Sequence, residues 1–114
     1  MFRRQKTDEV GPAEVADLQA RGAVLLDVRE DDEWTARHAS DAVHVPLARV
    51  GEAASRFAGQ EVLTVCRSGA RSGRAAKTLA AAGVDVRNVD GGMSAWASAG
   101  LPVARDDGSP GRAS

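Results

Sequence analysis

The chain has 114 residues, of which 43% are hydrophobic and 27% charged, which is typical of one soluble globular domain and too short for two hydrophobic cores. Its formal net charge of −1 gives no reason to expect binding to nucleic acid or to a membrane surface. The single cysteine excludes an intrachain disulfide and a zinc site made of cysteines alone. Neither a metal nor another cofactor is expected.

Residues 1–9 are expected to be a polar lead-in to the folded domain. They contain basic side chains but no apolar segment of the kind found in a secretory signal. No stretch of the chain approaches the ~20 apolar residues that a membrane-spanning helix needs. A cytoplasmic location is the resulting expectation, because a free thiolate survives best in a reducing compartment.

Residues 11–22 predict the first helix, with Pro12 suited to its first turn and Gly22 to its C-terminal stop. Residues 23–28 follow as a nearly continuous apolar run, which is typical of a central strand covered on both faces. Asp27 lies at the end of this strand, where a buried carboxylate must find a partner because an unpaired one is costly.

Residues 31–37 predict a short helix that begins with acidic side chains, and Trp34 in this helix is expected to anchor the core. Residues 42–45 predict a short strand. Residues 47–57 predict a further helix that ends at Gly59, because apolar residues recur there at helical spacing. These apolar residues are Val50, Ala53, Ala54 and Phe57.

The stretch around Cys66 is the most informative part of the chain. Residues 62–65 have the length and β-branched content of a buried strand, and residues 73–83 predict a helix. The apolar face of that helix comprises Ala75, Ala76, Leu79 and Ala82. The only thiol therefore lies where a strand turns into a helix, and the Gly and Ser of the turn let successive backbone N–H groups point at the sulfur.

The basic residues near this thiol favour a reactive cysteine. Between residues 62 and 84 the chain carries four basic residues and no acidic one, which leaves a net charge of −5 elsewhere. They are Arg67, Arg71, Arg74 and Lys77. Cations and a helix N-terminus lower a cysteine pKa from about 8.5 to roughly 3.5–7.5. The alternative is a buried structural cysteine, a frequent role for a lone cysteine, but the flanking Gly, Ser and Arg residues favour a nucleophile.

Residues 84–89 predict the last strand, and the segment 90–102 predicts a closing helix. Asp90 is expected to cap this helix, whereas Met93, Trp96 and Ala97 are expected to face inward. Residues 104–114 are polar and rich in turn residues, so a disordered tail is expected there.

The order of these elements predicts an α/β fold. Strands near residues 23–28, 42–45, 62–66 and 84–89 alternate with helices, which indicates a parallel sheet of about five strands with helices on both faces. Ligands of such sheets bind at the carboxyl ends of the strands, where both Cys66 and Asp27 are expected.

Cys66-Arg67-Ser68-Gly69-Ala70-Arg71-Ser72 resembles the active-site loop of the rhodanese family of single-domain sulfurtransferases. Asp27-Val28-Arg29 resembles the family's Asp-x-Arg signature, and Gly91-Gly92 followed by Trp96 resembles its closing helix. The resemblance covers residues 10–103 and implies a rhodanese fold for them. Cysteine-dependent phosphatases with a comparable loop have five residues between Cys and Arg, but only four separate Cys66 from Arg71 here.

The segment 37–46 matches the family pattern only in part. Arg37 and Asp41 replace its two glycines, and His44 replaces its asparagine. Asp41 is expected to keep the turn, because Asp tolerates a left-handed backbone. The histidine that the family has at the position of His38 is structural, so neither His38 nor His44 is expected to be catalytic.

The resemblance implies that Cys66 takes a sulfane sulfur from a donor such as thiosulfate, holds it as a persulfide and passes it to cyanide or a thiol. The implied binding residues are Arg67, Ser68, Gly69, Ala70, Arg71 and Ser72. Arg71 is expected to turn inward and Arg67 outward toward an anionic donor, while Asp27 and Arg29 brace the loops. The alternative function is a carrier module that receives sulfur from one partner in a sulfur relay and delivers it to another.

Overall fold

A computed structural model describes residues 8–104 of the chain. Five parallel strands form its main sheet, in the order β1-β6-β5-β2-β4. The strands are β1 (Asp8–Val10), β2 (Val24–Asp27), β4 (Val43–His44), β5 (Glu61–Val65) and β6 (Asp85–Val89). The expected parallel α/β sheet is therefore confirmed, with β5, the strand before Cys66, at its centre.

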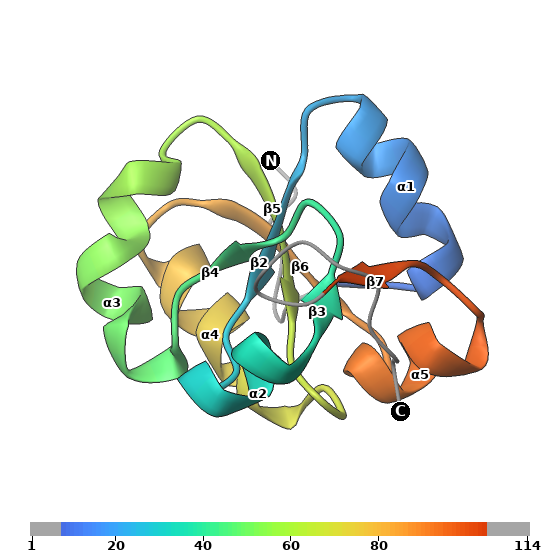
Figure 1. Ribbon diagram of the computed structural model, residues 1–114. Coiled ribbons are helices and arrows are strands. Elements are labelled where there is room, and N and C mark those ends of the chain that lie inside the picture. Colours follow the sequence, from blue (N-terminus) through green and yellow to red (C-terminus); the bar gives the residue numbers. More distant parts are fainter. Residues whose placement is uncertain (1–7, 105–114) are drawn as a thin grey trace.

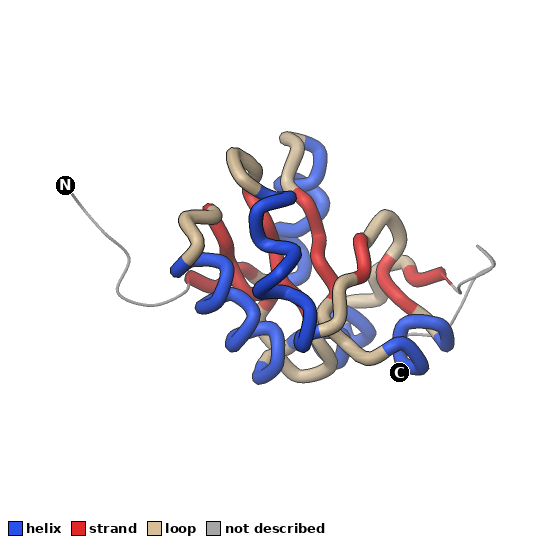
Figure 2. The backbone as a smooth tube through the Cα atoms, turned by 90° about the vertical axis from the view of Figure 1, so that its left-hand side faces the viewer, coloured by secondary structure: helices blue, strands red, loops and turns tan. Residues whose placement is uncertain are grey.

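Helices cover both faces of this sheet (Figure 1). Helices α1 (Pro12–Ala20) and α5 (Gly92–Ser98) lie on one side. Helices α3 (Val50–Ala53) and α4 (Ala70–Ala81) lie on the other, and short 3-10 turns extend α3 at both ends. The view turned by 90° shows helices in front of the strands (Figure 2).

The alternation of side chains along the strands divides the core into two layers. Leu26 and Val62 belong to the layer under α3 and α4, whereas Leu25 and Leu63 belong to the layer under α1 and α5. All four side chains are at most 1% exposed. The nearly continuous apolar runs of β2 and β5 follow from this burial on both faces.

The remaining elements lie at the margin of the sheet. Helix α2 (Asp31–Ala36) follows the carboxyl end of β2. Strands β3 (His38–Ala39) and β7 (Val103–Ala104) form a separate antiparallel pair. Asp41 has a φ of 67°, the left-handed conformation expected for it where the family pattern has a glycine.

The structure differs from the sequence-based expectations at both ends of the domain. Asp8 and Glu9, expected in the lead-in, belong to strand β1, and Ala104, expected in the tail, belongs to β7. The apolar core pattern did not reveal β1, because it is a short edge strand with two acidic residues. The other residues of the expected lead-in and tail, 1–7 and 105–114, lie outside the described part of the chain.

Trp34 is not a core anchor. No residue of α2 is fully buried, and the Trp34 ring is stacked between two histidine rings instead. Its centroid lies 3.6 Å from that of His38 and 4.8 Å from that of His44, with nearly parallel planes in both pairs. The helical pattern could not show this arrangement, because both histidines come from elements after the helix.

Two helix ends also differ from their predictions. Helix α4 begins at Ala70 rather than at Gly73, so Arg71 and Ser72 are in its first turn, and Ala82 is exposed rather than part of its buried face. Asp90 is exposed and does not cap α5; the cap position belongs to Gly91, which has a φ of 74°. The N–H of Asp90 instead donates to the carbonyl of Val10 and so ties β6 to β1.

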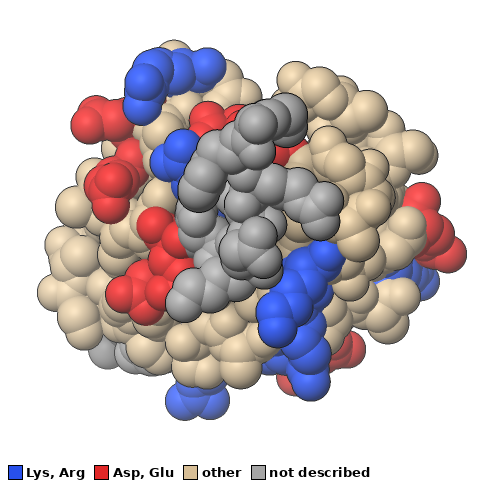
Figure 3. Space-filling view, turned by 180° about the vertical axis from the view of Figure 1, so that it is seen from behind, with Lys and Arg blue, Asp and Glu red and all other residues tan. Residues whose placement is uncertain are grey.

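Basic and acidic side chains share the face opposite to that of Figure 1, where they form separate small groups (Figure 3). None of the helices in residues 8–104 is long and apolar enough to cross a membrane.

Candidate active site

Cys66 directly follows the central strand β5, and it is 1% exposed. By strand alternation its side chain lies on the same face as Val62, in the core layer beneath α4. Its Sγ accepts hydrogen bonds from the backbone N–H of Gly69 at 3.1 Å and from the hydroxyl of Ser72 at 3.3 Å. The neighbouring amide therefore points at the sulfur and not away from it.

Gly69 makes this local geometry possible. Its φ of 111° is a conformation that L side chains rarely adopt, and it occupies the cap position before α4. The reversal of the chain at Gly69 places its own N–H and the N terminus of a 12-residue helix at Sγ. The positive end of the helix macrodipole favours an anion at that position.

The surroundings of Sγ favour the thiolate. Burial raises the pKa of the Cys66 thiol, but hydrogen bonds from the Ser72 hydroxyl and from the N–H groups of Ser72, Gly69 and Ser68 outweigh it. The net effect is a pKa below the usual value. This is the direction expected for a nucleophilic cysteine, and a merely buried cysteine would show the opposite direction.

Helix α5 holds the loop from the other side. The N–H of Met93 donates to the carbonyl of Cys66 at 2.7 Å, and the N–H of Ser94 donates to the carbonyl of Arg67 at 2.9 Å. Gly92 lets the two backbones approach this closely, because a Cβ there would lie 2.7 Å from the carbonyl carbon and oxygen of Arg67 and closer still to the carbonyl oxygen of Cys66. The family resemblance identified Gly91-Gly92, but it did not predict this contact between α5 and the Cys66 loop.

Asn88 is a further residue of the site that the sequence did not reveal. Its side chain is on β6, it is 4% exposed, and its Oδ1 lies 2.5 Å from the Ser72 hydroxyl oxygen. Its Nδ2 donates to the carbonyl of Gly69 at 3.2 Å. Asn88 lies two residues after Val86 and therefore on the same face of β6. An asparagine on a face that also carries a buried valine was the available signal, since a buried amide needs polar partners.

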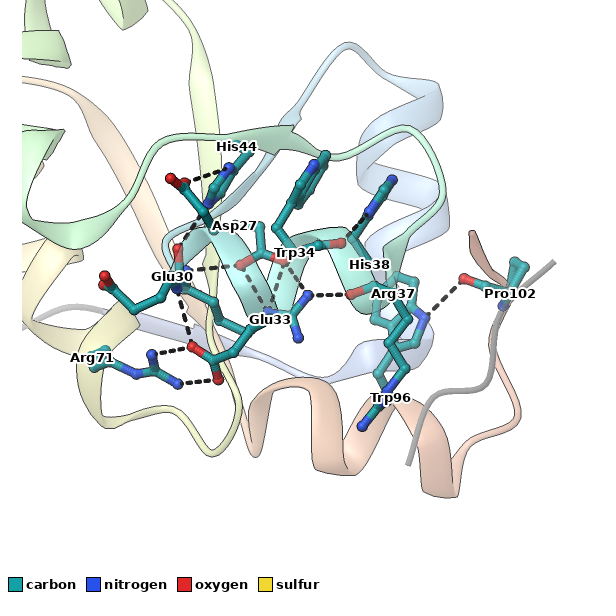
Figure 4. Close-up of polar contacts among 12 residues, drawn as sticks. Asp27, Glu30, Glu33, Trp34, Arg37, His38, His44, Arg71, Trp96 and Pro102 are labelled. Atoms are coloured by element: carbon teal, nitrogen blue, oxygen red, sulfur yellow. Dashed lines mark hydrogen bonds and ion pairs between the residues drawn. The ribbon is translucent and has the colours of Figure 1, made fainter. Parts of the chain in front are cut away.

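Arg71 is in the first turn of α4, and its two terminal nitrogens bind the carboxylate of Glu33 on α2 at 2.6 and 3.0 Å (Figure 4). The hydrogen bond from Arg71 holds the pKa of Glu33 at about 2. The same bond raises the pKa of Arg71, and the charge of Cys66 raises it further. The guanidinium therefore lies close enough to act on the sulfur electrostatically, while its hydrogen bonds hold helix α2.

Arg67 is exposed and lines a cavity of about 270 Å³ beside the loop, which agrees with the outward orientation expected for it. The side chains of Asp32, Glu33 and Arg37 also line this cavity, so both signs of charge face it.

Asp27 and Arg29 form a buried ion pair at the carboxyl end of β2. Nε and Nη2 of Arg29 bind the Asp27 carboxylate at 2.8–3.0 Å, and both residues are at most 4% exposed. Nη2 of Arg29 also donates to the carbonyl of Arg37, just beyond α2. The backbone carbonyl of Arg29 bonds the ring of His44. The pair therefore holds the segment that carries Glu33.

Among residues 8–104, no group of three or more His, Cys, Asp or Glu side chains lies close enough together to bind a metal ion. His38 contacts the carbonyl of Trp34 through Nδ1, and His44 contacts Arg29. Both histidines thus have structural partners around α2.

The fold and the site together define a parallel α/β domain with a nucleophile-type cysteine between its central strand and a helix N-terminus. The chain belongs to the rhodanese-like domain family, whose sequence pattern it matches over residues 11–99. It is 37% identical over 101 residues to thiosulfate sulfurtransferase 16 from Arabidopsis thaliana chloroplasts, covering 76% of this chain and 84% of that protein. It is 31% identical over 98 residues to the thiosulfate sulfurtransferase GlpE of Actinobacillus pleuropneumoniae, covering 83% and 91%.

Solved structures show the same fold. A thiosulfate sulfurtransferase from Pseudomonas aeruginosa superposes with a TM-score of 0.78 at 28% identity, covering 92% of this chain and 21% of that one. A rhodanese-related protein from Thermoplasma volcanium superposes with a TM-score of 0.77 at 23% identity, covering 85% and 97%.

Some relatives are considerably longer than the match. The chain is 36% identical over 104 residues to a protein of Synechocystis but spans only 58% of it. It spans 46% of a relative from Mycobacterium tuberculosis that is named as an HTH-type transcriptional regulator. The domain therefore occurs both by itself and joined to other segments.

Proposed function

We propose that this protein is a sulfurtransferase that takes a sulfane sulfur from a small anionic donor such as thiosulfate and passes it to cyanide or a thiol through Cys66. The observation that carries the proposal is the pair of donors on Sγ, the N–H of Gly69 at 3.1 Å and the hydroxyl of Ser72 at 3.3 Å. A fixed backbone donor such as the Gly69 N–H stabilises an anionic sulfur without reorganisation during the reaction, and the Ser72 hydroxyl adds a second donor. The relatives named as thiosulfate sulfurtransferases support the same reaction class.

In the first step the Cys66 thiolate attacks the outer sulfur of thiosulfate. A bond forms between Sγ and that sulfur while the sulfur–sulfur bond of the donor breaks, and its electron pair leaves with sulfite. The product is a Cys66 persulfide anion. The N–H groups around Gly69 and the first turn of α4 hold its negative charge.

In the second step the cyanide carbon, or the sulfur of an acceptor thiolate, attacks the terminal sulfur of the persulfide. The bond between this sulfur and Sγ breaks, and its electron pair returns to Cys66 as the thiolate. The nucleophile is thereby regenerated, and the acceptor leaves as thiocyanate or as a new persulfide.

The other residues of the loop support these steps from fixed positions. Arg67 faces the cavity beside the loop and attracts the anionic donor and the departing sulfite. Arg71 adds positive charge near the sulfur while Glu33 fixes its orientation. Ser68 supplies a further N–H toward Sγ, and Ala70 is the first residue of α4, the helix whose N-terminus lies at Sγ.

The experiment is a test for the persulfide itself. The protein is incubated with thiosulfate, and its intact mass is measured before and after cyanide is added. We expect a gain of one sulfur atom that cyanide removes as thiocyanate, and no gain in a Cys66→Ala variant. Release of phosphate from p-nitrophenyl phosphate without any sulfur adduct would contradict the proposal.

A sulfur-carrier module is the second candidate function. A Bacillus subtilis relative, 39% identical over 74 residues, is named as a candidate sulfur carrier protein, and this chain spans 40% of it. A carrier would accept sulfur from a persulfidated protein much faster than from thiosulfate. Mass measurement after incubation with each donor therefore distinguishes the two functions.

A further inference from the structure

The Ser72 hydroxyl is within reach of more acceptors than it can serve. Its oxygen lies 2.5 Å from Oδ1 of Asn88, 3.3 Å from Sγ of Cys66 and 3.3 Å from the carbonyl oxygen of Gly69. A serine hydroxyl has one proton to donate. Ser72 is 0% exposed, so water does not donate a hydrogen bond to these acceptors in place of its hydroxyl.

The orientation of the Asn88 amide follows from its other contacts. Nδ2 lies 3.2 Å from the carbonyl oxygen of Gly69 and 3.4 Å from a carboxylate oxygen of Glu9, both of which only accept. Oδ1 therefore faces the hydroxyls of Ser72 and Thr64. The Thr64 hydroxyl has a closer acceptor in the carbonyl of Ser72, at 3.0 Å, and donates its proton there. The proton that Asn88 Oδ1 accepts therefore comes from the Ser72 hydroxyl.

We propose that Asn88 is a positioning residue that competes with the Cys66 sulfur for the single proton of the Ser72 hydroxyl. While the sulfur is a thiol, the hydroxyl donates to Asn88, and its oxygen can accept the S–H. When the thiol loses its proton to solvent, the hydroxyl turns and donates to the sulfur anion. The hydroxyl proton stays on the Ser72 oxygen throughout, and Asn88 Oδ1 gives up its bond.

This competition sets how easily Cys66 ionises. Because ionisation costs the bond between Ser72 and Asn88, removing the Asn88 amide makes the thiolate easier to form. Removing the Ser72 hydroxyl has the opposite effect, because the anion then loses a donor. The effect of Asn88 must pass through Ser72, so it disappears once the hydroxyl is gone.

Several charged groups also face this cluster and stay in place in these variants. Glu9 approaches Asn88 from β1, and Arg71 approaches from α4 with its partner Glu33 on α2. Arg67 is in the loop itself, and the Asp27–Arg29 pair neutralises the end of β2.

The test is a titration of the thiolate by its ultraviolet absorbance. The chain has one cysteine and no tyrosine, so the signal belongs to Cys66 alone. Relative to the wild type, we expect the pKa of Cys66 to fall by about 0.5–1 unit in Asn88→Ala and to rise by a similar amount in Ser72→Ala. The Ser72→Ala/Asn88→Ala double variant should titrate like Ser72→Ala.

Thr64→Val is the matched control, because Thr64 belongs to the same polar cluster but donates to the backbone of Ser72. Its titration should match the wild type. If Asn88→Ala does not fold, Asn88→Val keeps a side chain suited to a strand and removes the same amide.

A higher pKa in Asn88→Ala, or an equal shift with and without the Ser72 hydroxyl, would overturn the inference. It rests on the proposed function, because the thiolate is the nucleophile proposed there. The titration needs no sulfur donor, however. A protein that never gains sulfur but shows these shifts would refute the sulfurtransferase and leave the competition for the proton established.

Discussion

Arg71 takes part in two interactions of different kinds, one by hydrogen bonds and one by charge alone. It binds Glu33 through both terminal nitrogens, and its charge lies close enough to Cys66 for each to affect the other. Sequence reasoning expected this side chain to turn inward at the end of the loop. The structure shows that an acidic residue from α2, far away in the sequence, determines its orientation.

We expect Arg71→Ala to reduce sulfur transfer by about a hundredfold, because a preorganised positive group near a developing anion contributes on the order of 3 kcal/mol. Rates of thiocyanate formation from thiosulfate and cyanide measure this. Arg74→Ala is the matched control, since Arg74 is an exposed residue of the same helix. Equal rates for both variants would show that Arg71 has no part in the reaction.

The buried ion pair at the end of β2 yields a second prediction, which concerns stability. Asp27→Asn leaves the guanidinium of Arg29 buried without its counter-charge, and we expect the free energy of unfolding to fall by about 3–5 kcal/mol. Urea denaturation measures the change. Asp17→Asn, at an exposed position of α1, should alter it by less than about 0.5 kcal/mol. If Asp27→Asn lowered the free energy of unfolding by no more than Asp17→Asn does, a role of the ion pair in bracing α2 would be contradicted.

At the scale of elements, the approach of α5 to the Cys66 loop is the contact on which the site geometry depends. Two N–H groups at the start of α5 bind two carbonyls of the loop, and only a residue without a side chain fits between them. The Cys66 loop is therefore held between the starts of two helices, α4 and α5.

Gly92→Ala tests this contact. The added Cβ would collide with the carbonyl groups of Cys66 and Arg67, so we expect lower stability and a displaced loop with at least tenfold slower sulfur transfer. Gly100→Ala is the control, because Gly100 also has a positive φ, 70°, but open space around its Cβ. It shares the backbone strain and lacks the collision. Unchanged transfer in Gly92→Ala would mean that the loop keeps its geometry without α5.

The elements also show how far sequence reasoning reached. Helix and strand order, the two-sided burial of β2 and β5 and the turn at Cys66 followed from local patterns of apolar residues, Gly and Ser. Asn88, Glu33 and the Gly92 contact did not, because each depends on which distant segments meet at the carboxyl edge of the sheet. Trp34 was misplaced for the same reason, since its partners His38 and His44 become neighbours only after folding.

For the molecule as a whole, the Glu33–Arg71 pair links stability to pH. The pKa of Glu33 is about 2 in the folded protein, compared with 4.5 for an ordinary glutamate. The folded state therefore binds fewer protons than the unfolded state, and the pair stabilises the fold above about pH 4.5. This contribution is lost as the pH falls through about 2.

We expect Glu33→Gln to be less stable than the wild type by on the order of 1 kcal/mol at pH 6, a modest value because the pair is about one-quarter exposed. The difference should shrink toward zero near pH 2. Urea unfolding midpoints at both pH values measure it, and Glu52→Gln, at an exposed position, should show no such dependence. A difference that persists in acid would point to packing rather than charge.

The near-complete burial of Cys66 has a consequence for which of its chemical forms a bulky reagent can reach. In the proposed persulfide the added sulfur would lie about 2 Å from Sγ, the length of a sulfur–sulfur bond. The Cys66 thiol is thus shielded from bulky oxidants by its burial. The outer sulfur of the persulfide would lie farther from the buried Sγ. We therefore expect a bulky electrophile to modify the persulfide form of the protein faster than the thiol form.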